Sequence, residues 1–261
     1  MTTSAYKSRG FTLIEMVITI VVLGVLMAGT ATYITNSTIA YTNIAQRDQL
    51  TTLGRITVEQ VTRELRHALP NSIRIQNNCI EFFPVKAGSV YLDLPVSSAD
   101  TSFTAMNFSI PAGSNIEHVI VYPYNVTTLY SASNPGLRAG FTSATGSPTA
   151  TITLSSNYRF ALHAPHRRFY LAEDPVSYCI VGTNLNRYEN YGVSGGQSAP
   201  PGGTAQLMAE NIQTNDGGAV TPFTYTPGSL QRSAIITLDF RFLINNEWIR
   251  LSHEVQIRNV L

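Results

Sequence analysis

A run of apolar residues near the amino terminus, from Phe11 to Ala31, contains a single charged side chain, Glu15. An α-helix of that length, at a rise of ~1.5 Å per residue, spans the ~30 Å hydrocarbon core of a membrane. Lys7 and Arg9 precede the run without any acidic residue, and positive charge at that place favours a cytoplasmic amino terminus. The sequence therefore predicts one membrane-spanning helix over residues 11–31.

Glu15 is the residue of this run that needs an explanation. A charged side chain costs roughly 2.5 to 3.5 kcal/mol in the middle of a membrane helix and less near the interface, so it usually has a partner. In one interpretation Glu15 stays near the lipid headgroups. In the other it awaits a cation that exists only in an assembled state, and cleavage after Gly10 would create one, the α-amino group of Phe11.

The stretch RGFTLIEMVITIVVLGVL, which starts at Arg9, resembles the class III signal of type IV pilins and type II secretion pseudopilins. In that family a membrane prepilin peptidase cleaves after the glycine and methylates the new amino terminus, and the glutamate pairs with a terminal amine in the filament. The resemblance implies that residues 1–10 are a leader peptide and that Gly10 and Phe11 form the cleavage site. It also implies that Phe11 is methylated and that Glu15 is the assembly residue.

The helical pattern continues beyond the apolar run, over residues 32–69. At about 100° per residue, one arc of this segment is apolar. Its members are Leu50, Val58, Val61, Leu65, Ala68 and Leu69. The opposite side is charged, with Arg55, Glu59, Arg63 and Arg66. We expect an amphipathic helix that ends before Pro70, weakened over residues 30–43 by β-branched and short polar side chains.

From residue 70 onward the period of the apolar pattern changes to two. Short runs are separated by Gly, Pro, Asn or Asp, as is typical of strands: SIRIQ, CIEFF, SVYLDL, HVIVYPY, TITL, RFYLA and VSYCIV. Residues 131–149 and 190–206 are predicted to be flexible loops. The expected fold class is α+β, in which the long amino-terminal helix packs on an antiparallel, β-rich, pilin-like domain over residues 70–261.

The clearest pair of strands is SAIITLDFRFLI and EWIRLSHEVQIR, which Asn245 and Asn246 join. Two residues of this kind suit a tight turn, so the pattern predicts a hairpin. We expect the core to contain alternate residues of the first strand and the single tryptophan. They are Ile236, Leu238, Phe240, Phe242 and Trp248.

The two cysteines, Cys79 and Cys179, have neither CxxC spacing nor a nearby histidine pair, which argues against a metal site. In an exported domain a disulfide between them is the leading interpretation, and two buried thiols are the alternative. A bond between them would close a loop of about 100 residues and contribute on the order of 3 to 5 kcal/mol in the chain-entropy model.

A second resemblance lies in RRFYLAEDPVSYCIVGTNLNRYENY, residues 167–191, together with the terminal VQIRNVL. These stretches are similar to the larger minor pilins, which include the J-type pseudopilin of type II secretion and the W-type minor pilin. Within that group the likeness is strongest to the O-type minor pilin of the mannose-sensitive haemagglutinin (MSHA) pilus.

The second resemblance implies a minor pilin at or near the filament tip that primes assembly and contributes to adhesion. The alternative is a J-type pseudopilin of a type II secretion system. The implied partners are other minor and major pilins, the inner-membrane assembly platform and the prepilin peptidase. The implied location is the inner membrane, with the head in the periplasm, and after assembly a pilus on the cell surface.

Other patterns give only weak candidates for chemistry. HAPHRR gathers four candidates for an anion or catalytic site, although exposed polar surface is the preferred interpretation: His163, His166, Arg167 and Arg168. QTNDGG contains one acid, Asp216, too few for the ~6 to 8 oxygen ligands of calcium. No GxSxG, Walker, HExxH or GxGxxG motif occurs, so we expect no catalytic residue, metal or cofactor. With 17 basic and 16 acidic residues, the chain has no basic field for nucleic acid.

Overall fold

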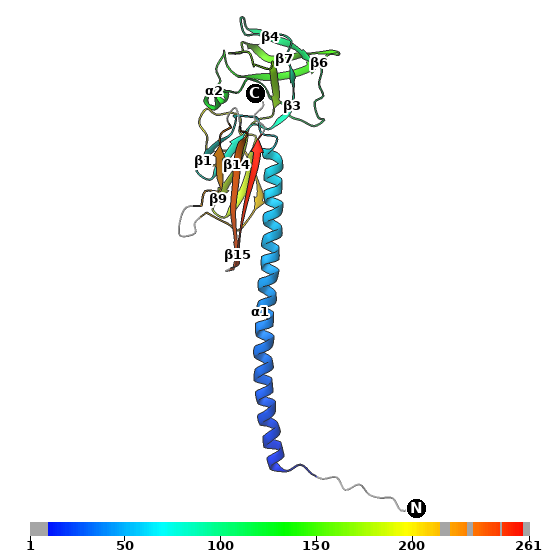
Figure 1. Cartoon of the computed structure of the whole chain (residues 1–261), viewed down its shortest axis with the longest axis vertical. Helices are drawn as coiled ribbons and strands as arrows, with labels where there is room; N and C mark the ends of the chain where they lie inside the picture. Colours follow the sequence, from blue (N-terminus) through cyan, green and yellow to red (C-terminus); the bar gives the residue numbers. More distant parts are fainter. Residues whose placement is uncertain (1–9, 215–219, 229–231, 246, 258–261) are drawn as a thin grey trace, which may run out of the picture. The chain divides into compact units, whose positions relative to one another are not determined.

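The computed structural model describes residues 10–214, 220–228, 232–245 and 247–257. The chain divides into two compact units between Gln49 and Leu50. A long helix, α1 (Leu13–Leu65), makes up most of the first unit, and its last turns belong to the second unit (Figure 1). The remainder is an antiparallel β-rich domain, so the predicted α+β class is confirmed.

The helix ends at Leu65 rather than at Leu69, because the chain after Leu65 joins a sheet. Pro70 disfavours the helical conformation for the residue before it. Ala68 instead forms a β-bridge with Pro84. The N–H of Leu69 donates a hydrogen bond of 2.8 Å to the carbonyl of Phe83. The last apolar residues of the predicted helical face are therefore buried, but in extended rather than helical backbone.

Three antiparallel sheets form the second unit. The first has the order β1 (Arg74–Gln76), β2 (Cys79–Phe82), β9 (Val176–Val181), β10 (Asn184–Glu189), β11 (Thr204–Ala209). The second has the order β12 (Ile212–Gln213), β14 (Ala234–Ile244), β13 (Phe223–Thr226), with β15 (Glu247–Ile257) also paired to β14. The third has the order β3 (Val85–Val90), β8 (Arg168–Ala172), β5 (His118–Val121), β6 (Arg138–Thr145), β7 (Thr149–Tyr158), β4 (Asp100–Met106), and a short helix, α2 (Val126–Tyr130), follows β5.

The end of α1 packs on the second sheet through the predicted apolar arc. Leu50, Val61 and Leu65 are fully buried in one core with the alternate residues Ile236, Leu238, Phe240 and Phe242 of β14. Gly54 marks a close approach, since a Cβ there would lie 2.3 Å from Cδ1 of Leu251 in β15. The charged side of the helix is exposed, and it carries an ion pair of 3.7 Å between Arg63 and Glu59.

The predicted hairpin is confirmed, since β14 and β15 pair from Ala234–Ile257 to Ile244–Glu247. Asn245 has the positive φ, 50°, that a tight turn requires, and Asn246 lies outside the described residues. The prediction for Trp248 is wrong, because its side chain is 52% exposed. Trp248 pairs with Leu243, whose side chain lies on the sheet face opposite to the core residues of β14.

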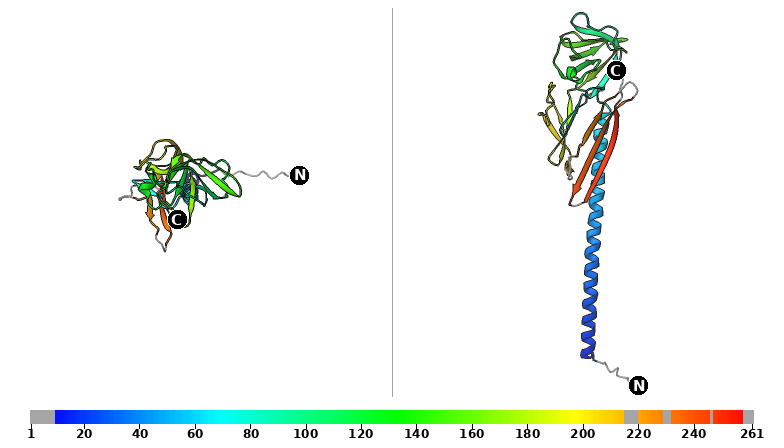
Figure 2. Two further views of the ribbon diagram at one scale, coloured as in Figure 1. Left: turned by 90° about the horizontal axis from the view of Figure 1, so that it is seen from above. Right: turned by 60° about the vertical axis from the view of Figure 1, so that its left-hand side comes forward.

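The third sheet closes on itself (Figure 2, cyan to green). Its two edge strands, β3 and β4, meet at a bridge between Tyr91 and Ala105 and at a hydrogen bond of 2.9 Å from the N–H of Leu92 to the carbonyl of Thr104. The enclosed side chains form a separate core that includes Phe103, Ile152, Phe160, Phe169 and Leu171. Closure pairs strand edges that would otherwise be open to other chains.

The predicted loop over residues 131–149 is wrong, because it contains β6 and completes the closed sheet. The strand sequence RAGFTSAT is made largely of small and polar residues, and only Ala139 is buried in it. Tertiary pairing with β5 and β7 therefore decides its conformation, whereas its own sequence lacks the apolar alternation of a typical strand.

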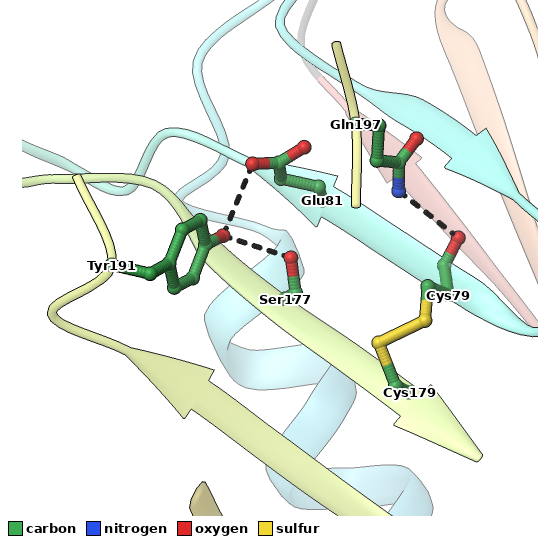
Figure 3. Close-up of a disulfide and its surroundings, with 6 residues drawn as sticks. All are labelled: Cys79, Glu81, Ser177, Cys179, Tyr191 and Gln197. Atoms are coloured by element: carbon green, nitrogen blue, oxygen red, sulfur yellow. Dashed lines mark hydrogen bonds between the residues drawn. A yellow bond between two sulfur atoms is a disulfide. The ribbon is translucent and has the colours of Figure 1, made fainter. Parts of the chain in front are cut away.

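The closed sheet is an insertion between two neighbouring strands of the first sheet. β2 and β9 pair antiparallel from Cys79–Cys179 to Phe82–Val176, and the chain between them forms β3 to β8. Cys79 and Cys179 are joined by a disulfide with a Cα–Cα distance of 4.1 Å (Figure 3). The predicted bond is confirmed, and it fastens the two strands at the base of the insertion.

Candidate processing and assembly site

Gly10 and Phe11 lie before the first turn of α1, in residues without regular secondary structure. Gly10 is exposed, and the Phe11 side chain is 77% exposed. Exposed backbone outside helices and strands is where proteases cut most readily. The geometry therefore leaves the Gly10–Phe11 peptide bond accessible to an enzyme.

Glu15 lies in the first turn of α1 and reaches back to Thr12. Its N–H donates to the Thr12 hydroxyl at 3.4 Å, and its carboxylate accepts from the Thr12 N–H at 3.5 Å. This reciprocal pair is a capping box, and the positive end of the helix dipole also favours a carboxylate there. The carboxylate is thus held at the end of the helix, beside the peptide unit that follows Phe11.

The apolar side chains that follow Glu15 are exposed in the described structure. α1 is long and apolar enough to cross a membrane, and none of its most apolar window is buried. The large exposed residues of this stretch include Met16, Val17, Ile18, Ile20, Val21, Val22, Leu23, Val25, Leu26 and Met27. A contiguous apolar surface of this kind marks a membrane or protein interaction site. The apolar helix therefore fits anchoring in a membrane before assembly.

The segment over residues 30–43, where weak helix formers are concentrated, is helical. Its threonine hydroxyls donate to backbone carbonyls three or four residues earlier, at 2.8 to 3.0 Å. The donors are Thr30, Thr32, Thr35, Thr38 and Thr42. These bonds satisfy the hydroxyls within the helix, which reduces the cost of placing them in an apolar environment.

A half-buried charge cluster, formed by Glu64, Arg187 and Tyr178, connects the end of α1 to the first sheet. Arg187 of β10 donates to both carboxylate oxygens of Glu64, at 2.7 and 2.9 Å, and the Tyr178 hydroxyl donates to the same carboxylate. Burial alone would raise the pKa of Glu64, but the hydrogen bonds from Arg187 and Tyr178 outweigh it and lower that pKa. Burial beside Glu64 raises the pKa of Tyr178, so its hydroxyl stays a donor.

A second cluster lies beside the disulfide (Figure 3). Glu81 is 2% exposed, and its carboxylate accepts a hydrogen bond of 3.1 Å from Tyr191 and pairs with Arg74. Arg74 also donates to the carbonyls of Ser194 and Gly195, at 2.9 and 3.0 Å. The predicted loop over residues 190–206 is wrong for residues 204–206, which begin β11, and its earlier part is hydrogen-bonded to Arg74 of β1.

The weaker candidates do not form a site in the described structure. His163 contacts the Tyr91 hydroxyl at 3.4 Å, His166 and Arg167 are exposed, and Arg168 begins β8. Asp216, with most of the QTNDGG stretch, lies outside the described residues. Over the ranges that the structure describes, no group of three or more His, Cys, Asp or Glu is arranged to hold a metal ion.

Residues 6–31 match the family model of the prokaryotic N-terminal methylation motif. The chain carries this motif. The match includes Gly10, Phe11 and Glu15, and it supports the type IV pilin and pseudopilin superfamily, whose members are structural rather than enzymatic. The motif implies processing by a prepilin peptidase and assembly with other pilins. No curated protein and no solved structure matches the chain.

The sequence patterns missed the charge cluster at the end of α1. Glu64 and Arg187 are separated by 123 positions, and nothing in either local pattern distinguishes them from other charged residues. The signal in the sequence is that Glu64 lies three residues after Val61, and so on the same side of the helix as a core residue, where a charge needs a partner.

Proposed function

We propose that the chain is a minor pilin of a type IV pilus of the MSHA kind. A prepilin peptidase cuts it after Gly10 and methylates Phe11, and the processed subunit enters a filament. The observation that carries the proposal is the methylation motif at the start of α1, whose most apolar stretch has no buried side chain and in which Glu15 is the only charge before Arg47. In the filament, neighbouring subunits bury that apolar surface, and Glu15 pairs with the terminal amine of an adjacent Phe11.

The β-rich head supports a place at or near the filament tip. Its closed six-stranded sheet is an addition to the sheets that pack on α1, so the head carries a second core beyond the one that holds the helix. A head of this size would crowd a uniform shaft. At the tip it has room, and there the subunit primes assembly from the inner membrane and can contribute to adhesion.

Deletion of the gene tests the proposal against its rival, a J-type pseudopilin of a type II secretion system. We expect the deletion strain to lose most of its pili and to secrete folded enzymes normally. Normal pili together with blocked enzyme secretion would favour the rival. Mass spectrometry of sheared filaments then reports whether the subunit is present, cut after Gly10 and methylated at Phe11.

The capping box at Glu15 allows a sharper test of the ion pair. Glu15→Gln keeps a side chain that can accept from the Thr12 N–H but removes the charge, whereas Glu15→Val removes both. We expect both variants to be cut after Gly10 and to enter filaments at least about tenfold less than wild type, as the loss of one buried charge pair predicts. Wild-type incorporation of Glu15→Gln would show that helix capping, and not the charge, is what assembly requires.

A further inference from the structure

A pocket of about 510 Å³ opens beside the end of α1, and all of its charged side chains are cationic. Arg66 comes from the turn after α1, Lys86 from β3 and Arg168 from β8. No aspartate or glutamate of the described chain lines it. Because the whole chain is nearly neutral, this pocket is a local excess of positive charge.

The cations of this pocket are only partly neutralised by their own chain. Lys86 pairs with Glu173 at 3.1 Å, outside the pocket lining. Arg168 hydrogen-bonds to the Tyr170 hydroxyl, which carries no charge because burial raises the pKa of Tyr170. Arg66 is exposed, and the carbonyls at the end of α1 accept hydrogen bonds from backbone N–H groups of the following turn. The pocket therefore keeps positive charge that an external anion can neutralise.

An exposed apolar patch adjoins the pocket, as the strand register shows. Val90 of β3 pairs with Arg168 of β8, and the bridge between Tyr91 and Ala105 aligns Val90 with Met106 of β4. Residues directly opposite each other on neighbouring strands point to the same sheet face, so Arg168, Val90 and Met106 form one outward row across three strands. Val90, Leu92 and Met106 are 39%, 45% and 50% exposed.

We infer that this cationic–apolar surface, defined by Arg66, Arg168, Val90, Leu92 and Met106, docks a segment of a partner protein. The segment carries carboxylates beside apolar side chains, since these complement the pocket and the patch respectively. A protein is a better fit than a carbohydrate, because the exposed apolar groups are aliphatic or thioether rather than aromatic faces. Arg and Met are also enriched at protein interfaces. The inference goes beyond the proposed function and does not depend on the processing at Gly10.

Site-specific photo-crosslinking of the full chain in its own cells tests this surface. The photoreactive residue p-benzoylphenylalanine replaces Leu92, and in a control it replaces Leu207, which is 49% exposed on β11 of another sheet. We expect the adduct at position 92 to contain a partner peptide with Asp or Glu within a few residues of the crosslink. We expect Arg66→Glu, alone or with Arg168→Glu, to lower its yield at least about fivefold, because like charges repel across an interface.

Arg159→Glu is the matched control, because Arg159 is exposed and does not line the pocket. It should leave the adduct within about twofold of wild type, as expected for a charge outside the interface. Arg66→Glu keeps the test valid if Arg168→Glu misfolds, since Arg66 is exposed, and the Cys79–Cys179 bond on a non-reducing gel reports folding. The inference is overturned by an adduct at 92 no stronger than at 207, by one insensitive to Arg66→Glu, or by one formed with a glycan or lipid.

Discussion

The two ends of α1 differ in what surrounds them, although both are regular helix. Between Leu13 and Ile44 the large apolar side chains are exposed, whereas Leu50, Val61 and Leu65 are fully buried against the second sheet. The carboxyl-terminal end is stabilised by burial within its own chain. The amino-terminal end has no such partner in the described structure and needs lipid or other protein to cover it. The comparison shows that one helix can serve as part of a core and as an anchor.

Removing the disulfide should have the largest effect, because it destabilises the head without acting on the exposed part of α1. We expect the double variant Cys79→Ser and Cys179→Ser to lower the free energy of unfolding of the head by about 3 to 5 kcal/mol, as the chain-entropy model gives for a loop of this length. Denaturant unfolding of the full chain in detergent micelles measures the change, with helix content followed by far-UV circular dichroism. The exposed part of α1 should keep its helix signal after the head unfolds, and simultaneous loss of both signals would break the comparison.

A matched pair of leucine truncations tests the comparison within the helix itself. Leu65→Ala should destabilise the head by about 2 to 5 kcal/mol, because it leaves a cavity in the core. Leu26→Ala should leave head unfolding unchanged, since that side chain is 62% exposed. Thermal melting in micelles measures the stability of the head in both variants. Equal melting temperatures would contradict the expected difference between Leu65→Ala and Leu26→Ala.

The charge cluster at Glu64 predicts a pH dependence. The pKa of Glu64 is lowered in the folded chain, so its contribution to stability is present above its ordinary value of 4.5 and is lost as pH falls through the folded value. Glu64→Gln should cost about 1 to 3 kcal/mol at neutral pH and flatten the acid dependence, because it removes a charged acceptor.

Glu59→Gln is the control for Glu64→Gln. It breaks an ion pair on the same helix whose side chains are 74% and 63% exposed. The free energy of unfolding should change by less than about 1 kcal/mol, as for most surface ion pairs. Equal effects of the two substitutions in acid titrations of stability would show that the Glu64 cluster has no special role.

The smallest effect should come from an exposed residue of the packed end of the helix. Ile56 is 53% exposed although it lies between Leu50 and Val61. Ile56→Ser should change the free energy of unfolding by no more than about 0.5 kcal/mol, as surface substitutions usually do. A loss as large as that of Leu65→Ala would mean that position along the helix, and not burial, decides its stability.

The parts of the fold that sequence could predict are those with a strong local period. The apolar arc of α1, its charged side and the β14–β15 hairpin follow directly from alternation and spacing. The sequence predicts Trp248 in the core because large apolar side chains are usually buried, whereas the strand register puts its side chain on the outer face. The closed sheet was missed because β6 lacks alternation and because closure depends on Tyr91 meeting Ala105, a contact that no local pattern records.

The functional residues also fall into those that the local sequence predicts and those that only the fold brings together. Gly10, Phe11 and Glu15 are neighbours in sequence, so their spacing alone was enough to predict a processing motif. The hydrogen bonds between Thr12 and Glu15 form a capping box, which the spacing of these residues allows but does not by itself predict. The cationic–apolar surface joins residues from the turn after α1, from β3 and the segment after it, from β4 and from β8, and only the strand register brings Arg168 beside Val90.

The insertion between β2 and β9 has a consequence for how such a head can change. The inserted segment begins after Phe82 of β2 and ends before Val176 of β9, and these two residues are paired. The disulfide between Cys79 and Cys179 joins the same two strands. A segment of another length or fold could occupy the same opening without altering the sheet that packs on α1. The inserted closed sheet has its own core, separate from the core that holds the end of α1. Replacement of the inserted sheet would therefore leave the core around α1 in place.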